Sequence, residues 1–233
     1  MWSLSPAETT ALLLSLKVAF WSVAASLPFA VALAWVLSRL SFPGKSLFDA
    51  VVHLPLVLPP VVVGYFLLLA FGRRGAVGAF LEEYLGITFI FLWTGAALAC
   101  AVMGLPLMVR AVRQSLDAVD RGLEAAAATL GASPFWVFAS VTLPLILPGI
   151  LTGMLLSFAR SLGEFGATIT FVSNIPGETQ TLPLAIYAFT QVPGGDAQAL
   201  RLCILSILLS LAALMASEVL VRRATVRAAG RDA

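Results

Sequence analysis

Two charged residues stand inside one of the most apolar parts of the chain. Arg160 and Glu164 lie in the stretch SFARSLGEFGAT, between GILTGMLL and ITFV. An ionisable residue near the centre of a membrane helix costs roughly 2.5–3.5 kcal/mol on insertion scales, so the pair is a functional hypothesis by default. At a spacing of i, i+4 the two side chains can share one helix face and partly neutralise each other.

Small polar residues accompany this pair and would allow close helix packing or a wet surface. One interpretation is that the helix face lines or braces a path for an anion. The other is an ion pair that holds one helix against its neighbour, which we favour because a tight anion site would trap its cargo. The candidates for a translocation path or a helix contact are Ser157, Arg160, Ser161 and Glu164.

The residue types that catalysis needs are scarce in this sequence. His53 is the single histidine, no serine stands in a G-x-S-x-G elbow, and no CxxC or HExxH motif occurs. The GKS at residues 44–46 is not a phosphate-binding loop, because the position five residues before Gly44 is Arg39 and that loop needs glycine there. We predict no catalytic residue, no metal site and no cofactor in this chain.

The composition is that of an integral membrane protein. Hydrophobic residues make up 60% of the chain and charged residues 11%, against roughly 25% charged residues in ordinary globular proteins. The mean hydropathy is +1.00, so lipid should be the solvent for most of the surface. A formal net charge of +2, with scattered basic residues, argues against a nucleic-acid partner.

Five stretches approach the length of about 20 apolar residues that crosses a bilayer. They cover roughly residues 11–37, 49–71, 88–109, 148–172 and 202–221. Pro28 in the first stretch and the Pro59-Pro60 pair in the second should kink or interrupt helix. We therefore predict an all-α integral membrane protein with about five transmembrane helices, forming a single domain over residues 1–233.

Basic residues near the ends of the spans indicate the orientation. One side of the membrane would hold Arg39, Lys45, Arg110, Arg113, Arg121 and the C-terminal residues Arg222, Arg223, Arg227 and Arg231. The other side holds Arg73 and Arg74, which Glu82 and Glu83 offset, and residues 173–200 contain no Lys or Arg. We predict an N-terminus outside the cell and a C-terminus in the cytoplasm.

Two connections are longer than simple turns, at about residues 114–147 on the cytoplasmic side and about 173–200 outside. In the first, Asp120 can cap a helix that begins near residue 121 and runs through residue 130. Gly131 can adopt the left-handed turn that ends such a helix. The cytoplasmic connection should therefore be a helix, a turn and a second helix.

The second short helix should run from Pro134 to about Thr142, with Ser133 as its N-cap. Leu143-Pro144 should stop it, and Pro148-Gly149 should open the next span. Its side chains Phe135, Trp136, Phe138 and Val141 are apolar for a cytoplasmic surface. They suit either a groove on another protein, or a position back against the helix bundle or the lipid interface.

A family resemblance favours the first alternative. Gly131, nine residues, Val141, one residue and Leu143-Pro144, after an Ala-rich stretch from Glu124, resemble the EAA loop of ABC importer permeases. The stretches FPGKSLFDAVVHLPLVLPPVVVGY and RSLGEFGATITFVSNIPGET, with the terminal span, are similar to the molybdate-type permeases of that family. Two positions differ, because the family usually has Ile at residue 141 and Glu six residues before the glycine, whereas Glu124 is seven before Gly131.

The resemblance implies a coupling helix that docks into a separate ATP-hydrolysing subunit, where ATP and Mg would bind. It implies a second copy of the permease, two ATPase subunits and a periplasmic oxyanion-binding protein at the bacterial cytoplasmic (inner) membrane. The coupling loop would then comprise Glu124, Ala125, Ala126, Gly131, Ala132, Ser133, Pro134, Phe135, Phe138, Leu143 and Pro144.

The external connection predicts a turn over residues 174–179 and a short amphipathic helix from Leu182 to Thr190. A binding protein would release its cargo onto such a rim, although a loop tied down for stability explains each residue equally well. The candidates for contact with a binding protein are Asn174, Pro176, Gly177 and Glu178.

The expected function is that of a permease subunit, without catalysis of its own, that moves a tetrahedral oxyanion inward. The resemblance implies molybdate, with sulfate, thiosulfate or tungstate as alternatives. An ATP-independent secondary transporter or channel is the alternative of another class. Such a protein would favour internal repeats or a ring of ionisable groups, and we find neither in the sequence.

Overall fold

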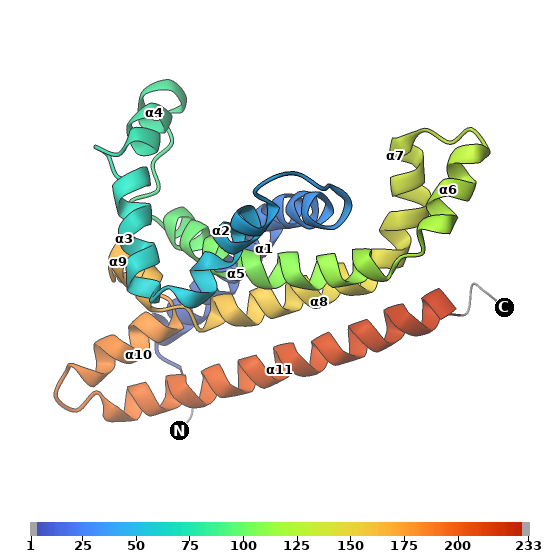
Figure 1. Ribbon diagram of the computed structural model, residues 1–233. Helices are drawn as coiled ribbons and strands as arrows, with labels where there is room; N and C mark the ends of the chain where they lie inside the picture. The colour runs from blue at the N-terminus through green and yellow to red at the C-terminus, as the bar shows by residue number, and fades with distance from the viewer. Residues whose placement is uncertain (1–3, 230–233) are drawn as a thin grey trace.

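The computed structural model describes residues 4–229, and the side chains of residues 4–216. All the regular structure in this range is helical (Figure 1). The elements are α1 (Pro6–Arg39), α2 (Lys45–Val57), α3 (Pro60–Phe71), α4 (Ala76–Leu85), α5 (Trp93–Ala118), α6 (Arg121–Thr129), α7 (Pro134–Val137), the π-helical turn η1 (Phe138–Thr142), α8 (Leu143–Leu162), α9 (Gly166–Val172), α10 (Leu182–Thr190) and α11 (Asp196–Ala229).

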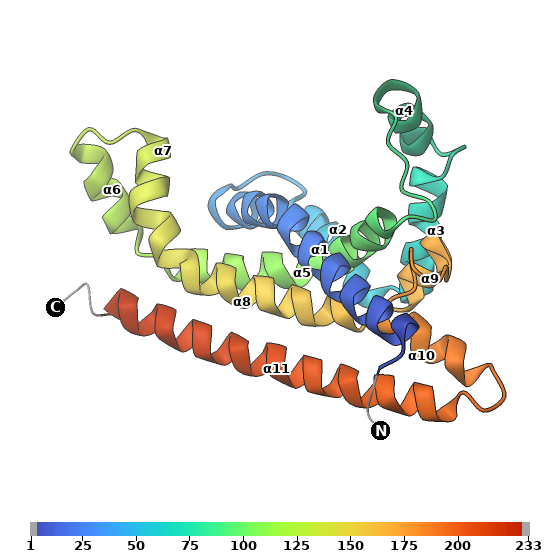
Figure 2. The ribbon, with the colours of Figure 1, turned by 180° about the vertical axis from the view of Figure 1, so that it is seen from behind.

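Helix α5 lies at the centre of the bundle, with α1 and α8 packed along it. Two clusters of buried side chains follow its length. One joins α5 to α1, α3 and α9, and the other joins α5 to α1, α2 and α8. Helix α11 lies outside this core, against α8 and α10 (Figures 1 and 2).

Among the described residues, four helical stretches are long and apolar enough to cross a membrane. They are α1, α5, the run Pro134–Leu162 and the part of α11 over Asp196–Ala216. The pair α2 and α3 meets the same test together but bends by 113° at the break between them. The prediction of about five spans agrees with these four stretches and the bent pair, and the stretch 49–71 is interrupted at the Pro59-Pro60 pair as predicted.

The prolines in the first two predicted spans act differently. Pro28 lies inside α1, which continues through it to Arg39. The Pro59-Pro60 pair separates two helices, because α2 ends at Val57 and α3 begins with Pro60 as its first residue. A proline at the first helical position loses no hydrogen bond, since its missing N–H would have had no partner there.

The predicted span 148–172 begins too late and contains a break, although its end agrees with the end of α9. Helix α8 is already helical at Leu143 and stops at Leu162, and α9 is a separate helix that starts at Gly166. Glu164 lies in the break, where its Oε1 accepts the N–H of Ala167 at 2.8 Å. The carboxylate thus caps the start of α9, which gives the second helix a beginning of its own.

Other predicted boundaries also shift. Helix α5 starts at Trp93 instead of residue 88 and runs to Ala118, beyond the predicted 109. Phe91 just before it has a positive φ of 60°, which does not fit a helix. Helix α11 begins at Asp196 instead of residue 202, so the second connection is shorter than the predicted 173–200.

The two ends of the bundle carry different elements. The start of α1, α4 and α10 lie at one end, whereas α6, α7 and the C-terminal turns of α11 lie at the other (Figures 1 and 2). The predicted basic tail, Arg222, Arg223, Arg227 and Arg231, lies outside the residues whose side chains are described. Which end faces the cytoplasm remains a prediction at this point.

Candidate functional site

The segment from Asp120 to Trp136 folds as its local sequence signals predict. The Asp120 side chain accepts the N–H of Gly122 at 2.8 Å and caps α6. Gly131 has a φ of +89°, a left-handed conformation that closes the helix and suits glycine best. The Ser133 hydroxyl then accepts the N–H of Trp136, and Pro134 is the first residue of α7.

Leu143-Pro144 does not stop the second helix, contrary to the prediction, and Pro148-Gly149 does not begin the next one. Residues Pro134–Leu162 are helical throughout, with the π-helical turn η1 between α7 and α8. Helix α7 nevertheless stands up from the axis of α8, so the helical path bends near η1 (Figures 1 and 2). A π turn together with a following proline is a usual cause of such a bend.

Helices α6 and α7 project from the bundle and expose apolar side chains (Figure 1). Leu130 is 90% exposed, Phe135 73% and Trp136 63%. These side chains do not lie back on the bundle, whereas Phe138 is half-buried. The predicted loop residues Ala125, Ala126, Gly131, Ser133, Pro134, Leu143 and Pro144 are also exposed, and Ala132 is half-buried.

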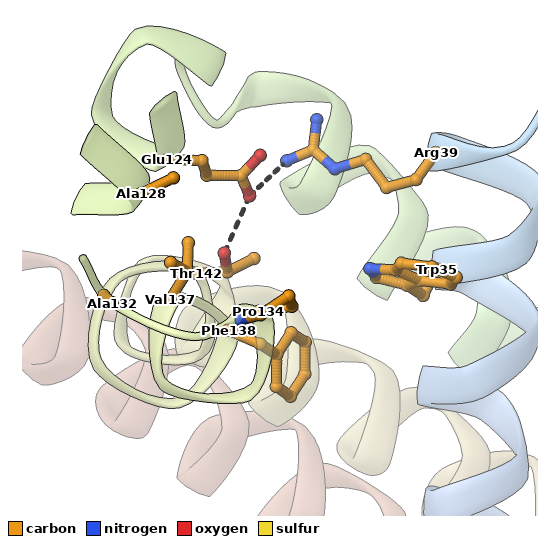
Figure 3. Close-up of a pocket in the computed structure, with 9 residues that line it drawn as sticks. All are labelled: Trp35, Arg39, Glu124, Ala128, Ala132, Pro134, Val137, Phe138 and Thr142. Atoms are coloured by element: carbon orange, nitrogen blue, oxygen red, sulfur yellow. Dashed lines mark hydrogen bonds and ion pairs between the residues drawn. The ribbon is translucent and has the colours of Figure 1, made fainter. Parts of the chain in front are cut away.

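Glu124 turns in the opposite direction, toward the end of α1. Its Oε1 accepts a bond from Arg39 Nη2 at 2.8 Å and another from Thr142 Oγ1 at 2.7 Å (Figure 3). These three residues form one wall of a cavity of about 340 Å³ between α1, α6, α7 and η1. Trp35 and Phe138 form other parts of the wall (Figure 3).

Arg160 and Glu164 form the predicted ion pair, although Glu164 lies beyond the end of the helix. Arg160 Nη1 is 2.6 Å from Glu164 Oε2. The Glu164 side chain is 1% exposed and that of Arg160 is 29% exposed. The carboxylate is therefore held by the guanidinium on one oxygen and by the N–H of Ala167 on the other.

A seam of small polar side chains adjoins this pair. The hydroxyls of Ser22 on α1 and Ser161 on α8 lie 3.0 Å apart, and Ser161 also donates to the carbonyl of Ser157 at 2.8 Å. Ser157 is fully buried, and its hydroxyl meets the space beside Gly104 of α5. These contacts pack α1, α5 and α8 closely, which is the role that small residues play between membrane helices.

Helices α3 and α9 touch at their backbones, a contact that the sequence did not reveal. A β-carbon added to Gly64 would lie 2.6 Å from the carbonyl oxygen of Ala167, and one added to Gly166 would lie 2.8 Å from Cβ of Pro60. Both helices follow a break in a membrane span. The only available signal was a glycine soon after each break.

The external candidates divide into tethered and open residues. The amide of Asn174 donates to the carbonyl of Leu184 at 3.4 Å, and Glu178 Oε1 accepts the N–H of Trp93 at 3.3 Å. Pro176 and Gly177 are exposed. The first two residues thus serve the fold of this segment, and only the turn between them offers a free surface.

A further ion pair, absent from our sequence predictions, joins α1 and α11, the first and last helices in the described range. Arg201 of α11 donates through Nε and Nη2 to Glu8 Oε1 of α1, at 3.0 and 2.9 Å. Glu8 also accepts from the Ser5 N–H and is fully buried. This pair ties the start of α1 to the first turns of α11.

Comparison with known proteins identifies the fold. A family model described as "binding-protein-dependent transport system inner membrane component" matches residues 26–226. The chain belongs to this family. The family description fits a multi-pass protein of the inner membrane.

Individual relatives within this family are permease proteins. The molybdenum transport system permease protein ModB of Escherichia coli K12 is 60% identical over 225 residues, covering 97% of this chain and 98% of the relative. Its counterpart in Haemophilus influenzae is 58% identical over 93% of this chain and 94% of the relative. The sulfate permease CysW of Synechococcus elongatus is 42% identical over 76% of this chain and 61% of the relative.

Solved structures of ABC transporters have the same fold. A bacterial alginate ABC transporter, in complex with an alginate-bound periplasmic protein, matches with a TM-score of 0.74 and 18% identity. The match covers 94% of this chain and 80% of that chain. The inward-facing methionine transporter MetNI matches with a TM-score of 0.67, 19% identity and coverage of 93% and 94%.

Proposed function

We propose that this chain is the permease subunit of an ABC importer that moves molybdate into the cytoplasm. The observation that carries this proposal is the 60% identity to a molybdenum permease along almost the entire length of both chains. The sulfate permease is more distant and matches a smaller share of the chain. Sulfate, thiosulfate and tungstate remain the competing cargo, because all are tetrahedral oxyanions of similar charge.

The importer would contain two copies of this chain, two ATPase subunits and a periplasmic binding protein. The exposed apolar side chains of α6 and α7 support an ATPase contact, because a free aqueous surface rarely gathers three such residues. The family description and the alginate transporter's periplasmic partner support a binding protein. ATP and Mg would bind in the ATPase subunits.

The orientation follows from this assignment. The end that carries α6 and α7 would face the cytoplasm, together with the C-terminus, and the end that carries α10 and the start of α1 would face the outside. The coupling loop would be α6, α7 and η1, including Glu124, Gly131, Phe135 and Leu143. The turn at Pro176 and Gly177 would then belong to the rim that meets the binding protein.

Transport would follow from two conformations of the permease pair. ATP bound between the partner subunits would draw the two coupling loops together, and the spans attached to them would tilt. Only a partner with different affinity for the two conformations can drive that change. Because Arg160 is neutralised by Glu164, the adjoining surface would attract a dianion weakly and release it readily.

Reconstitution into liposomes with the ATPase subunit and the binding protein tests this function. We expect uptake of labelled molybdate that requires ATP and that excess sulfate does not abolish. Gly131→Glu should abolish uptake while the protein still inserts into the membrane. Gly86→Glu is the matched control, because Gly86 also has a positive φ and open space around it but lies near α4, at the other end. Uptake without ATP would contradict the proposal.

A further inference from the structure

Helix α6 packs against α7 and η1, and the Glu124 side chain bonds it to the ends of α1 and η1. Among the residues whose side chains the structure describes, Glu124 makes the only side-chain hydrogen bonds between α6 and another helix. The other side-chain bonds of α6, made by Asp120 and Thr129, stay within its own ends. The cavity of about 340 Å³ separates much of α6 from α1.

The Glu124 carboxylate joins two separate elements through one oxygen. Arg39 is the last residue of α1, and Thr142 is the last residue of η1, directly before α8. The Arg39 side chain is 11% exposed and that of Glu124 is 23% exposed. Water competes weakly at such exposure, and a bond between charged groups is the strongest kind that side chains form. We call Glu124, Arg39 and Thr142 the Glu124 bridge.

The bridge continues into the bundle through the residue next to Arg39. The Ser38 hydroxyl donates to Asp117 Oδ1 of α5 at 2.5 Å, and Asp117 Oδ2 is 3.7 Å from Arg113 Nε. Arg113 Nη1 in turn lies 3.0 Å from Asp49 Oδ2 of α2. The last turn of α1 therefore links α6 on one side to α5 and α2 on the other.

The Glu124 carboxylate is placed for internal support through its Oε1. Both of its bonds point toward α1 and η1 (Figure 3), whereas Leu130, Phe135 and Trp136 are the side chains that project into solvent. The geometry assigns the docking surface and the internal attachment to different residues of the same loop.

We propose that Glu124 is a positioning residue that transmits the displacement of α6 to α1 and to the bend before α8. The proposal rests on the proposed function, since it concerns the coupling loop of that importer. A partner that pulls α6 then moves the ends of two membrane helices together. Without the Glu124 bridge, α6 can move while α1 and α8 stay in place. ATP hydrolysis is then uncoupled from transport.

The attachment itself can be measured on the isolated permease in detergent, by hydrogen exchange of the amides in residues 121–131. Glu124→Ala removes both hydrogen bonds of the bridge and Arg39→Ala removes one. Exchange should rise about tenfold or more in each, and further in Glu124→Ala. Thr142→Val removes one hydroxyl and should give a smaller rise. Thr152→Val is its matched control, because the Thr152 hydroxyl bonds only to the carbonyl of Pro148 in its own helix. Unchanged exchange in Glu124→Ala would overturn the proposal.

Transmission can be measured in liposomes as molybdate transported per ATP hydrolysed. Glu124→Ala should bind the ATPase subunit with wild-type affinity and hydrolyse ATP, yet transport at least about tenfold less per ATP, because both bonds of the bridge are lost. The charge exchange Arg39→Glu with Glu124→Arg should restore part of that ratio, which a merely destabilised loop would not do. Weakened ATPase binding, as expected for Trp136→Ala, would instead make Glu124 a docking residue and refute the proposal.

The two experiments separate this inference from the proposed function. If the wild-type complex shows no ATP-dependent molybdate uptake, the proposed function fails, and the exchange measurement still decides whether the bridge holds α6. If wild-type uptake depends on ATP and Glu124→Ala keeps the wild-type ratio of transport to hydrolysis, the proposed function stands and the inference fails.

Discussion

Removing Arg160 should damage this protein more than removing both members of its ion pair. Arg160→Ala leaves the Glu164 carboxylate, which is 1% exposed, without its guanidinium. Only the N–H of Ala167 would still bond to that group. Arg160→Gln combined with Glu164→Gln removes both charges, and the carboxamide of Gln at residue 164 has the shape of the carboxylate and can still accept the N–H of Ala167.

The difference between the two variants can be estimated from burial. Leaving an uncompensated charge where a buried pair stood costs about 3–5 kcal/mol. Because the Arg160 side chain is 29% exposed, we expect the lower end, about 3 kcal/mol, for Arg160→Ala. The double variant replaces an ion pair by neutral hydrogen bonds and should cost about 1 kcal/mol. The expected difference of about 2 kcal/mol is roughly a thirtyfold change in the unfolding equilibrium.

The assay measures the free energy of unfolding. The protein is unfolded reversibly in mixed micelles that contain an increasing fraction of a denaturing detergent. Transport in liposomes provides the second measurement. A double variant that is stable and transports normally would make the pair a brace alone. A double variant that is stable but inactive would give Arg160 a role toward the anion as well.

Two outcomes would refute the reasoning. Arg160→Ala with wild-type stability would show that the buried carboxylate needs no partner. A double variant less stable than Arg160→Ala would show that the two charges stabilise the fold through more than their attraction to each other.

Further substitutions test two contacts that the structure revealed. Gly64→Ala places a β-carbon 2.6 Å from the carbonyl oxygen of Ala167, so the free energy of unfolding should fall by about 1–3 kcal/mol. The control is Gly163→Ala, whose β-carbon meets open space and should not lower the free energy of unfolding. Equal effects of the two substitutions would contradict the packing argument. Glu8→Gln and Arg201→Gln should each lower stability by about 1–3 kcal/mol through the loss of a charged hydrogen bond, and a double variant as destabilised as the sum of both would show that the two residues do not act as a pair.

The helix-turn-helix could be predicted from sequence because its signals are local. The Asp120 cap, the left-handed Gly131 and the pair Ser133-Pro134 each act on backbone groups within three residues. Such chemistry fixes the path of the chain before any distant contact forms. The same signals could not show that helix continues past Pro144, because a π turn upstream accommodates that proline.

Contacts between distant parts of the chain lay beyond local reasoning. Glu124 and its partner Arg39 are 85 residues apart. The sequence around Glu124 does not indicate that its side chain bonds within the protein. The break at Glu164 could not be predicted because the mean hydropathy of the surrounding stretch stays high across it. In retrospect, Gly163 and the carboxylate of Glu164, which accepts the N–H of Ala167, indicate that one helix ends and another begins here. The Arg160 and Glu164 pair itself was predictable from spacing alone.

Helix α11 links the protein to the thickness of its bilayer. Its 34 residues span about 51 Å at roughly 1.5 Å per residue, whereas the hydrocarbon layer is about 30 Å thick. Exposed apolar side chains such as Ile207, Leu211 and Met215 leave it facing lipid. A thinner or thicker bilayer changes the tilt of such a helix, and α10 packs against it. Acyl-chain length thus acts mechanically on the end of the bundle that carries α10.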